Sequence, residues 1–433
     1  MYMPVKIKFA IAFCVSLLWG IFSYYLDLKW IYELSDVIGE VPAYIVIFGI
    51  AIIPGYMSAF LLVSLLLDQR PKRTLLETYP PITILVAAYN EASAIVDTIH
   101  SIGAQDYRGE LDVIVVDDGS NDATAALITA TQARYPWLRL VNMSKNGGKA
   151  RALNFGLEHA RHDLIITLDA DSFLYQESLQ RLVERYVNDP PNTRAVAGAI
   201  VVRNSRKNWI TNAQEWDYFH GISAIKRTQS LYQGTLVAQG AFSIYDRQTV
   251  QTSGGFSDCV GEDIVLSWAI LKAGHRIGHA EDAYVFTNVP DTMKQFFGQR
   301  KRWSRGAIEA FKTHPGILFK PRLSTYFIYW NFFFPVLDLI FTLSFVPGII
   351  LALFGYYYIA GPLTIALIPV AIAMNYIMFI IGRKTFRTRG LHVRSNVRGF
   401  ITYSLIYGVI MQAVSVIGYY SELLNLKKDW GTK

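Results

Sequence analysis

The chain has 433 residues, of which 52% are hydrophobic, and its formal net charge is +7. This composition is typical of an integral membrane protein that also carries a soluble domain of ordinary size. The two cysteines, Cys14 and Cys259, are far apart, which excludes a disulfide framework and a cysteine metal cluster and favours a cytosolic soluble part. The positive charge gathers beside apolar stretches, where lipid attraction and topology explain it, and we find no nucleic-acid-binding signature.

Two apolar stretches near the N-terminus, residues 9–26 and 41–67, are each long enough to cross a bilayer. The first lacks an A-x-A cleavage site, so we interpret it as an uncleaved span and not as a signal peptide. The connection between the two is acidic, whereas the segment 70–73 after the second is basic. The positive-inside rule therefore predicts that the N-terminus and everything after the second span face the cytoplasm.

Three parts follow from this pattern: two spans in residues 1–70, a soluble α/β domain in 71–322, and further apolar helices in 323–433. The last part holds three candidate spans, at 331–359, 362–381 and 400–420, with a basic and hence cytoplasmic loop at 383–398. The apolar run 326–359 exceeds one span and contains Pro335 and Asp338. This leaves open that its first part lies along the membrane interface.

Three short apolar runs in the soluble domain end in polar loops. We predict strands at 82–88 and 111–116 with a helix at 91–105 between them, a right-handed parallel unit, and another strand at 164–171. Ligands of open parallel sheets bind beyond the carboxyl ends of the strands. The sequences YNE (89–91), DDGSND (117–122) and DAD (169–171) stand at these ends, so we expect three loops to converge on one crevice.

An acidic crevice cannot be a bare phosphate site, because carboxylates repel phosphate, but a divalent cation resolves the conflict. Asp169 and Asp171 are hard oxygen ligands suited to Mg²⁺ or Mn²⁺, and such an ion can bridge a diphosphate. The sequence NGGKARALN (146–154) opens a helix with two glycines and Lys149, which could meet phosphates. It is no Walker A loop, because Ala150 replaces the Ser or Thr of that pattern. Taken singly, DDGSND could be a surface turn and Lys149 a solvated side chain.

Two later motifs also have two interpretations. Asp263 in GED (261–263) is either an acid that complements a helix dipole or a general base for an attacking sugar hydroxyl. In the second case a metal ion would stabilise the departing diphosphate. The sequence GQRKRWSRG (298–306) is either a lipid-facing basic helix or a site where Arg302 pairs with diphosphate and Trp303 stacks on a sugar ring.

Together, YNE, DDGSND, DAD, GED and QRKRW, in this order and at these distances, resemble the processive membrane branch of the family 2 glycosyltransferases, which includes hyaluronan, chitin and cellulose synthases. The layout of two plus three spans is most similar to bacterial poly-β-1,6-N-acetylglucosamine synthases. The resemblance implies a GT-A fold inserted between transmembrane helices of the bacterial inner membrane. It also implies inverting transfer from a UDP-sugar donor to a growing polysaccharide, which the C-terminal helices help to export.

The resemblance further assigns roles to single residues. Asp263 matches the catalytic base, with Glu262 beside it, and Asp169 and Asp171 match the site of Mg²⁺ or Mn²⁺. The implied donor-binding residues are Tyr89, Glu91, Asp117, Asp118, Lys149 and Asp169. The implied acceptor and diphosphate residues are Gln299, Arg302, Trp303 and Gly240. A small membrane helper subunit is implied by the resemblance alone.

Two departures from the family pattern leave the donor sugar and linkage open. Gln239 stands where members often have Ser before Gly-Ala, and Gly261 stands where biofilm-type enzymes more often have Thr. A hyaluronan- or chitin-type synthase and a non-processive transferase acting on a lipid carrier are the alternatives. A transporter or scaffold is disfavoured, because the spans hold almost no ionisable residue apart from Asp338.

Overall fold

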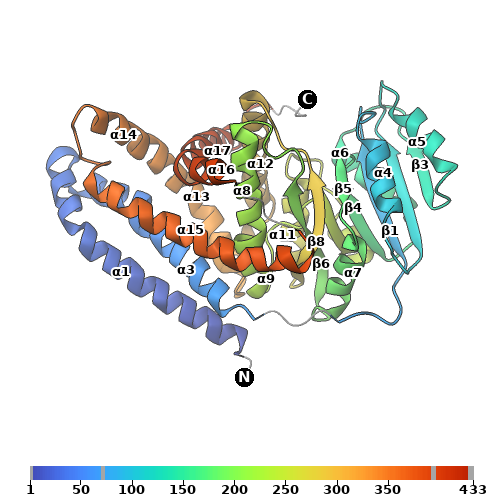
Figure 1. Ribbon diagram of the computed structural model, residues 1–433, viewed down its shortest axis with the longest axis horizontal. Coiled ribbons are helices and arrows are strands. Elements are labelled where there is room, and N and C mark those ends of the chain that lie inside the picture. Colours follow the sequence, from blue (N-terminus) through green and yellow to red (C-terminus); the bar gives the residue numbers. More distant parts are fainter. Residues whose placement is uncertain (1–2, 70–73, 392–395, 428–433) are drawn as a thin grey trace.

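The α/β part of the molecule is built around one mixed sheet of eight strands (Figure 1). The computed structural model describes residues 3–69, 74–391 and 396–427, so the basic segment 70–73 and part of the basic loop 383–398 lie outside the described residues. The strands follow the order β3-β2-β1-β4-β7-β6-β8-β5. Their bounds are β1 Ile82–Ala88, β2 Leu111–Asp117, β3 Leu138–Asn142, β4 Leu164–Leu168, β5 Ser172–Leu174, β6 Thr193–Val202, β7 Phe242–Asp246 and β8 Arg276–Thr287.

The three strands predicted from apolar runs form the parallel centre of this sheet. Strand β1 pairs in parallel with both β2 and β4, which confirms the predicted parallel unit. Its sequence ITILVAA is buried almost throughout, as is typical of strands that helices cover on both faces. Strand β4 ends at Leu168, earlier than predicted, because the chain turns at Asp169, whose carbonyl accepts a 3.0 Å hydrogen bond from the Ser172 amide.

Helices cover both faces of the sheet (Figure 1). Helices α4 and α7 pack on one face, and α6 and α11 pack on the other. The helix predicted at 91–105 begins only at Ile95, because Asn90 adopts a left-handed conformation (φ 56°) and starts a turn. The helices of this domain are α4 Ile95–Gly103, α5 Thr124–Gln132, α6 Lys149–His159, α7 Ser178–Asn188, α8 Trp209–His220, η2 Gly221–Lys226, α9 Arg227–Leu231, α10 Arg247–Thr252, α11 Glu262–Lys272, α12 Met293–Thr313 and η3 Pro315–Phe319.

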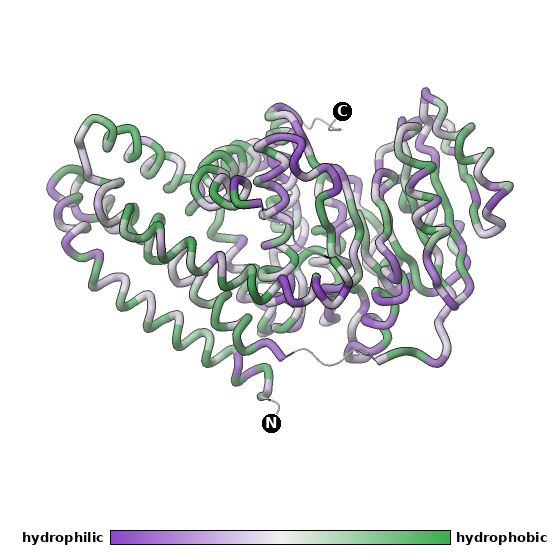
Figure 2. The backbone as a smooth tube through the Cα atoms, viewed as in Figure 1, coloured by the Kyte–Doolittle hydropathy of each residue, from purple (hydrophilic) through white to green (hydrophobic). Residues whose placement is uncertain are grey.

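Within the described residues, five helices are long and apolar enough to cross a membrane, two before the α/β domain and three after it. They form an apolar bundle at one end of the molecule (Figure 2). This confirms the predicted layout of two plus three. Their elements are α1 Val5–Ile38, then α2 Glu40–Ile47, η1 Phe48–Ile52 and α3 Ile53–Leu67, then α13 Thr325–Ile340, η4 Phe341–Phe345 and α14 Val346–Leu353, then α15 Pro362–Thr388, and last α16 Val397–Thr402, η5 Tyr403–Tyr407 and α17 Gly408–Leu423.

Two of the predicted span bounds were wrong. Helix α1 continues through the acidic residues that we assigned to a connection, so that the turn to the next helix is confined to Gly39, whose φ is 88°. The apolar run 326–359 is helical only as far as Leu353, in one continuous helical segment, Thr325–Leu353, and Pro335 lies inside it. A π-helical segment, η4, follows this proline and absorbs the irregularity.

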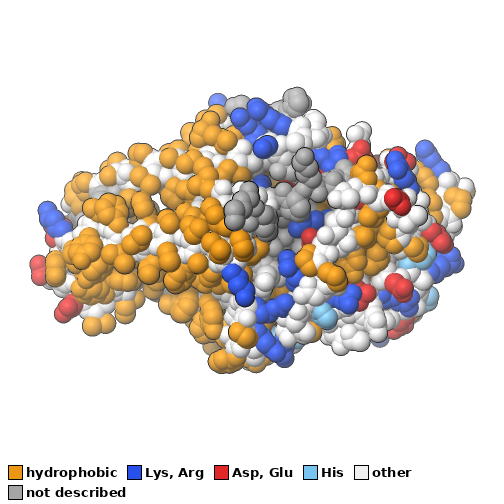
Figure 3. Space-filling model, turned by 90° about the horizontal axis from the view of Figure 1, so that it is seen from below, with side chains coloured by type: hydrophobic (Ala, Val, Ile, Leu, Met, Phe, Trp, Pro, Cys, Tyr) orange, Lys and Arg blue, Asp and Glu red, His pale blue; other side chains and the backbone are white. Residues whose placement is uncertain are grey.

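The apolar helices and the α/β domain share one hydrophobic core. Phe60 of α3 lies 5.6 Å from the ring of Tyr232 and 6.1 Å from that of Phe327, measured between centroids. The same core continues to Leu153 of α6 and Leu266 of α11. Side chains of Lys and Arg gather along the border between the two parts (Figure 3). The shared core therefore holds the α/β domain in a defined position against the bundle.

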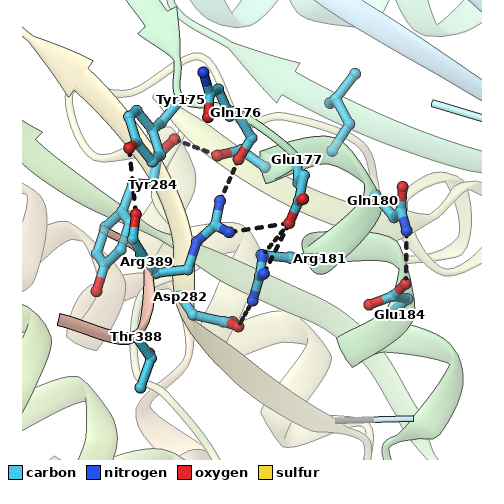
Figure 4. Close-up of polar contacts among 12 residues, drawn as sticks. Tyr175, Gln176, Glu177, Gln180, Arg181, Glu184, Asp282, Tyr284, Thr388 and Arg389 are labelled. Atoms are coloured by element: carbon cyan, nitrogen blue, oxygen red, sulfur yellow. Dashed lines mark hydrogen bonds and ion pairs between the residues drawn. The ribbon is translucent and has the colours of Figure 1, made fainter. Parts of the chain in front are cut away.

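A polar network joins the end of α15 to the α/β domain (Figure 4). The Arg389 guanidinium donates to a Glu177 carboxylate oxygen at 3.0 Å, and Glu177 also accepts from Arg181 of α7 at 2.8 Å. Arg181 in turn donates to Asp282 of β8 at 2.6 Å. Because the network links side chains from three elements, it fixes the last turn of α15 against the sheet.

Candidate active site

The loops after β1 and β2 are joined by hydrogen bonds at the carboxyl edge of the sheet. The Asn90 amide donates to Ser120 Oγ at 2.9 Å, and the Asn121 amide donates to Asn90 Oδ1 at 2.8 Å. The Glu91 amide donates to Thr124 Oγ1 at 2.8 Å. These bonds place Tyr89 and Glu91 beside the DDGSND loop, as the strand pattern predicted.

Asp117 and Asp118 have different surroundings although they are neighbours. Asp117 is 5% exposed, and its Oδ1 has no hydrogen-bond partner among the described residues. A buried acceptor without a partner is costly, which favours a ligand at this point. Both oxygens of Asp118 instead accept from the backbone, at 2.7 Å from Gly147 and 2.8 Å from Gly148. Asp118 therefore supports the backbone of the glycine loop.

Lys149 joins the edge of the sheet to the acidic pair. It is the first residue of α6, and its Nζ lies 2.6 Å from Asp169 Oδ1 and 3.5 Å from Glu262 Oε1. Burial alone would lower its pKa, but the two carboxylates outweigh burial and the pKa is raised. A Cβ added at Gly240 would lie 2.9 Å from Lys149 Nζ, so the glycine leaves room for the ammonium group to lie this close to the loop. Lys149, Asp169, Glu262 and Gly240, all predicted site residues, thus meet at one place.

The acidic pair stands at the first two positions of α11. Asp263 Oδ2 accepts from the Gly240 amide at 3.2 Å, and Oδ1 accepts from the Ile264 amide at 2.8 Å. The bond from the Ile264 amide agrees with the first interpretation of Asp263, an acid at the start of a helix. The bond from the Gly240 amide orients the carboxylate toward the loop that meets Lys149. Burial raises the pKa of Glu262 to about 7, Asp263 adds to this rise, and Lys149 opposes it. At neutral pH Glu262 holds a proton far more often than an ordinary carboxyl group.

This pKa gives the stability of the protein a testable pH dependence. Between the ordinary value of 4.5 and about 7, the folded protein binds more protons at Glu262 than the unfolded chain does, so stability falls as pH rises through this window. Glu262→Gln should therefore raise the midpoint of thermal unfolding above the window and change it little below. The exposed Glu158→Gln on α6 is the control. An effect of Glu262→Gln that does not vary with pH would contradict the assignment.

Helices α11 and α12 touch at two glycines. A Cβ added at Gly261 would lie 2.6 Å from the Cα of Gly306, and one added at Gly306 would lie 2.9 Å from the Cα of Gly261. The Gly261 amide also donates to Glu309 of α12 at 2.9 Å. The close approach explains why glycine precedes the acidic pair in this chain, and it sets the distance between that pair and the QRKRW motif.

Substitution at this crossing should therefore destabilise the protein. Gly261→Ala forces a methyl group against backbone, and overpacking of this kind costs about 1–3 kcal/mol. The midpoint of thermal unfolding in detergent should fall. Gly298→Ala, at the start of the same motif, is the matched control, because no atom lies within 4 Å of its added Cβ. Equal midpoints for the two variants would show that the crossing tolerates a side chain.

Helix α12 brings the predicted acceptor and diphosphate residues to the same site. Burial lowers the pKa of Arg302, and the charges of Glu262 and Asp169, which lie within electrostatic reach, partly offset this. Arg302 Nε and Gln299 Oε1 have no hydrogen-bond partner among the described residues. The Trp303 side chain is 49% exposed and free to meet a ligand. Unused polar groups beside an exposed indole are suited to bind a sugar diphosphate and a sugar ring.

A buried cluster behind Trp303 was missed by the sequence analysis. Arg300 is 2% exposed, pairs with Asp217 of α8 at 2.9 Å, and lies 4.1 Å from the centroid of the Trp303 ring. The Tyr407 hydroxyl, from η5 of the last apolar helix, donates to Asp217 at 2.8 Å. In the sequence, the only signal for the contact between Arg300 and Trp303 is their spacing of three positions on one helix.

Lys226 holds the loop that contains Gly240. Its Nζ donates to the Val237 carbonyl at 2.7 Å and also contacts Gln239 Oε1, while Gln239 donates to the Gly198 carbonyl at 2.6 Å. Burial lowers the pKa of Lys226 to about 8. Gln239, which departs from the family pattern, thus fixes the loop whose Gly240 amide meets Asp263.

The site has oxygen ligands for a divalent ion but no complete protein cage. Among the described residues, no group of three or more His, Cys, Asp or Glu side chains is arranged to hold one. Asp169 lies against Lys149, and Asp171 lies near Tyr218, whose pKa is raised to about 12 mainly by burial. Two carboxylates completed by phosphate oxygens are a usual Mg²⁺ environment, so these residues fit an ion that arrives with a diphosphate.

Comparison with known proteins agrees with this geometry. Residues 83–254 match the family described as Glycosyl transferase family 2. This segment belongs to glycosyltransferase family 2. Over 229 residues, the chain is 33% identical to poly-beta-1,6-N-acetyl-D-glucosamine synthase of Staphylococcus aureus (strain COL) and 30% identical to that of Staphylococcus epidermidis, in each case over 53% of this chain and 55% of the relative. The chain thus spans about half the length of the curated relatives it matches.

A solved structure supports the fold over nearly the whole chain. The mannosyltransferase PcManGT from Pyrobaculum calidifontis, in complex with GDP-Man and Mn2+, aligns with a TM-score of 0.57 over 98% of this chain and 100% of its own. The sequence identity is 19%, so the likeness concerns the fold. The predicted GT-A-like α/β domain, flanked by two and three long apolar helices, is confirmed.

Proposed function

We propose that this protein is a membrane-embedded, inverting and processive glycosyltransferase that polymerises N-acetylglucosamine from UDP-N-acetylglucosamine and exports the polysaccharide. One observation carries the proposal: Lys149 links the strand-end Asp169 to the acidic pair, and Arg302 of α12 lies within electrostatic reach of Asp169 and Glu262. The similarity to poly-beta-1,6-N-acetyl-D-glucosamine synthases favours this sugar.

The donor would lie along the carboxyl edge of the sheet. The unpartnered oxygen of Asp117 can accept a hydrogen bond from the N–H of uracil, and Tyr89 is exposed beside it. The diphosphate would lie near Lys149 and Arg302, whose charges balance its own. When bound, a Mg²⁺ or Mn²⁺ ion would be held by Asp169 and Asp171 and would supply further charge compensation at the diphosphate.

Asp263 would act as the general base. The acceptor hydroxyl forms a bond to the anomeric carbon of the donor while the bond from that carbon to the diphosphate oxygen breaks. The hydroxyl proton passes to Asp263, and UDP leaves with the electron pair, so the configuration is inverted. The Gly240 amide holds one oxygen of Asp263 in place at 3.2 Å. Because Glu262 tends to keep its proton, Asp263 faces less neighbouring negative charge.

The acceptor would reach Asp263 past Trp303. The half-exposed indole offers an apolar face to a sugar ring, and Arg300 holds it against the last apolar helix through Asp217 and Tyr407. A polymer that stacks on Trp303 would therefore start next to the bundle through which we propose it leaves. We place the bundle in the bacterial plasma membrane and the catalytic domain in the cytoplasm, where UDP-sugars are made. The helper subunit stays a prediction.

Donor binding tests the first part of this proposal. Calorimetric titration of the purified protein in detergent with UDP-N-acetylglucosamine, UDP-glucose and GDP-mannose should give the tightest binding for the first. Stronger binding of GDP-mannose would contradict the assignment of the nucleotide, and stronger binding of UDP-glucose would contradict that of the sugar.

The same titration tests the ion. Asp171→Asn removes one of the two carboxylates that would hold Mg²⁺ or Mn²⁺, so its affinity for UDP-N-acetylglucosamine should fall to the level that the wild type shows with a chelator. With chelator present, the two proteins should bind alike. Asp282→Asn, in the network of Figure 4, is the control for loss of an acid elsewhere on the domain. Metal-dependent binding that survives in Asp171→Asn would refute this ligand.

A further inference from the structure

A groove of about 550 Å³ lies where the first and third apolar helices begin. The side chains that matter for its chemistry are Lys6, Phe9, Lys320, Arg322, Tyr326 and Tyr329. None of its described lining residues is acidic. The groove therefore combines a cationic rim with an aromatic wall.

The position of the groove places it at one end of the bundle. Lys6 and Phe9 belong to the first turns of α1, and Tyr326 and Tyr329 belong to those of α13. The Phe9 and Tyr326 rings are in edge contact, with centroids 5.3 Å apart. Both helices are long and apolar enough to cross a membrane. Their first turns therefore lie at the depth where acyl chains meet headgroups.

Two of the three cationic side chains of the rim form no ion pair within the described part of the protein. Lys6 and Lys320 are exposed, and neither has an ion-pair partner among the described residues. Phe319, next to Lys320, is 85% exposed, which is unfavourable in water and natural at a membrane surface. Two ammonium groups in a groove that is also lined by aromatic rings complement a molecule that has an anionic head and an apolar tail.

One wall of the groove is tied to the helix that carries the acidic pair. The Arg322 guanidinium donates to the carbonyls of Leu271 at 3.0 Å, Gly274 at 2.6 Å and His275 at 2.7 Å. These carbonyls stand at the carboxyl end of α11, where a cation compensates the helix dipole. A ligand in the groove would thus stabilise the segment that anchors α11 to the bundle.

We propose that this groove is a binding site for an anionic phospholipid. The phosphate would lie between Lys6 and Lys320, and an acyl chain would pack on Phe9, Tyr326 and Tyr329. The groove includes none of the residues of the proposed sugar-transfer site, so the lipid proposal does not depend on the proposed function.

The test uses the whole protein in nanodiscs of phosphatidylcholine with and without phosphatidylglycerol. We expect a retained phosphatidylglycerol adduct by native mass spectrometry, together with a higher midpoint of thermal unfolding. The double variant Lys6→Gln/Lys320→Gln should lose both effects and should unfold like the wild type in phosphatidylcholine alone, because both side chains are exposed. Glycerol phosphate added to phosphatidylcholine nanodiscs should not raise the midpoint, which distinguishes a lipid from a free phosphate.

The control variant Lys384→Gln/Arg387→Gln removes the same charge from exposed positions at the end of α15. It should keep the adduct and the rise in midpoint. An undiminished adduct in the groove variant, or an equal loss in the control variant, would overturn the proposal. The second result would show that surface charge in general, and not this groove, attracts the lipid.

Discussion

Asp263→Asn should slow sugar transfer strongly while UDP-N-acetylglucosamine binding stays nearly unchanged. The amide keeps the shape of the carboxylate and can still accept a hydrogen bond from the Gly240 amide, but it cannot take the proton of the acceptor hydroxyl. General-base catalysis contributes about 10²–10⁴-fold to a rate, so the loss should be of this size. Initial rates of sugar transfer and donor titration on the same preparation would separate the two effects.

The control for this variant is Asp258→Asn. Asp258 lies shortly before the acidic pair, but it pairs with Arg151 at 2.8 Å on the surface. Its loss should leave the transfer rate near that of the wild type, because exposed ion pairs contribute little. If Asp263→Asn retained turnover, Asp263 would not be the base, and its contact with Gly240 would be purely structural.

Asp217→Asn should have the second large effect, this time on stability. The substitution leaves the Arg300 charge buried without its carboxylate, and breaking a buried pair in this way costs about 3–5 kcal/mol. The midpoint of thermal unfolding should fall strongly. Because Arg300 lies against the Trp303 ring, we also expect shorter polysaccharide at normal donor affinity.

Tyr407→Phe is the matched comparison for that prediction. It removes one hydroxyl and its hydrogen bond to Asp217 but keeps the ion pair, so it should cost only about 1 kcal/mol. The midpoint of thermal unfolding should fall further in Asp217→Asn than in Tyr407→Phe. Equal falls would contradict the stabilising role of the Arg300–Asp217 ion pair. Normal product length in both variants would show that the cluster does not position Trp303.

The centre of the sheet and the number of spans were predictable because their signals are local. The runs that became β1 and β4 are apolar and short, and they are followed by the polar sequences YNE and DAD. The two plus three apolar helices follow from hydropathy alone. The error at the start of α4 has a cause that local signals do not show. The turn that delays this helix depends on Asn90 and on hydrogen bonds to a loop about 30 residues away.

The parts of the site that sequence analysis missed rest on contacts between distant segments. The hydrogen bond between Asp217 and Tyr407 spans 190 positions, and no periodicity reports it. The approach of Gly261 to Gly306 is likewise visible only once α11 and α12 cross. Asp118 shows the converse case, because its place in a motif suggested a donor contact, whereas its two oxygens hold the backbone of the glycine loop.

The most direct test of the account is polymer formation by membranes that contain this protein, supplied with labelled UDP-N-acetylglucosamine and Mg²⁺ or Mn²⁺. We predict a labelled polymer that a β-1,6-hexosaminidase cuts and a chitinase does not, and that is absent from membranes with Asp263→Asn. Addition of a single sugar to a lipid, or a polymer that forms only when UDP-glucuronate is also present, would contradict the proposed activity.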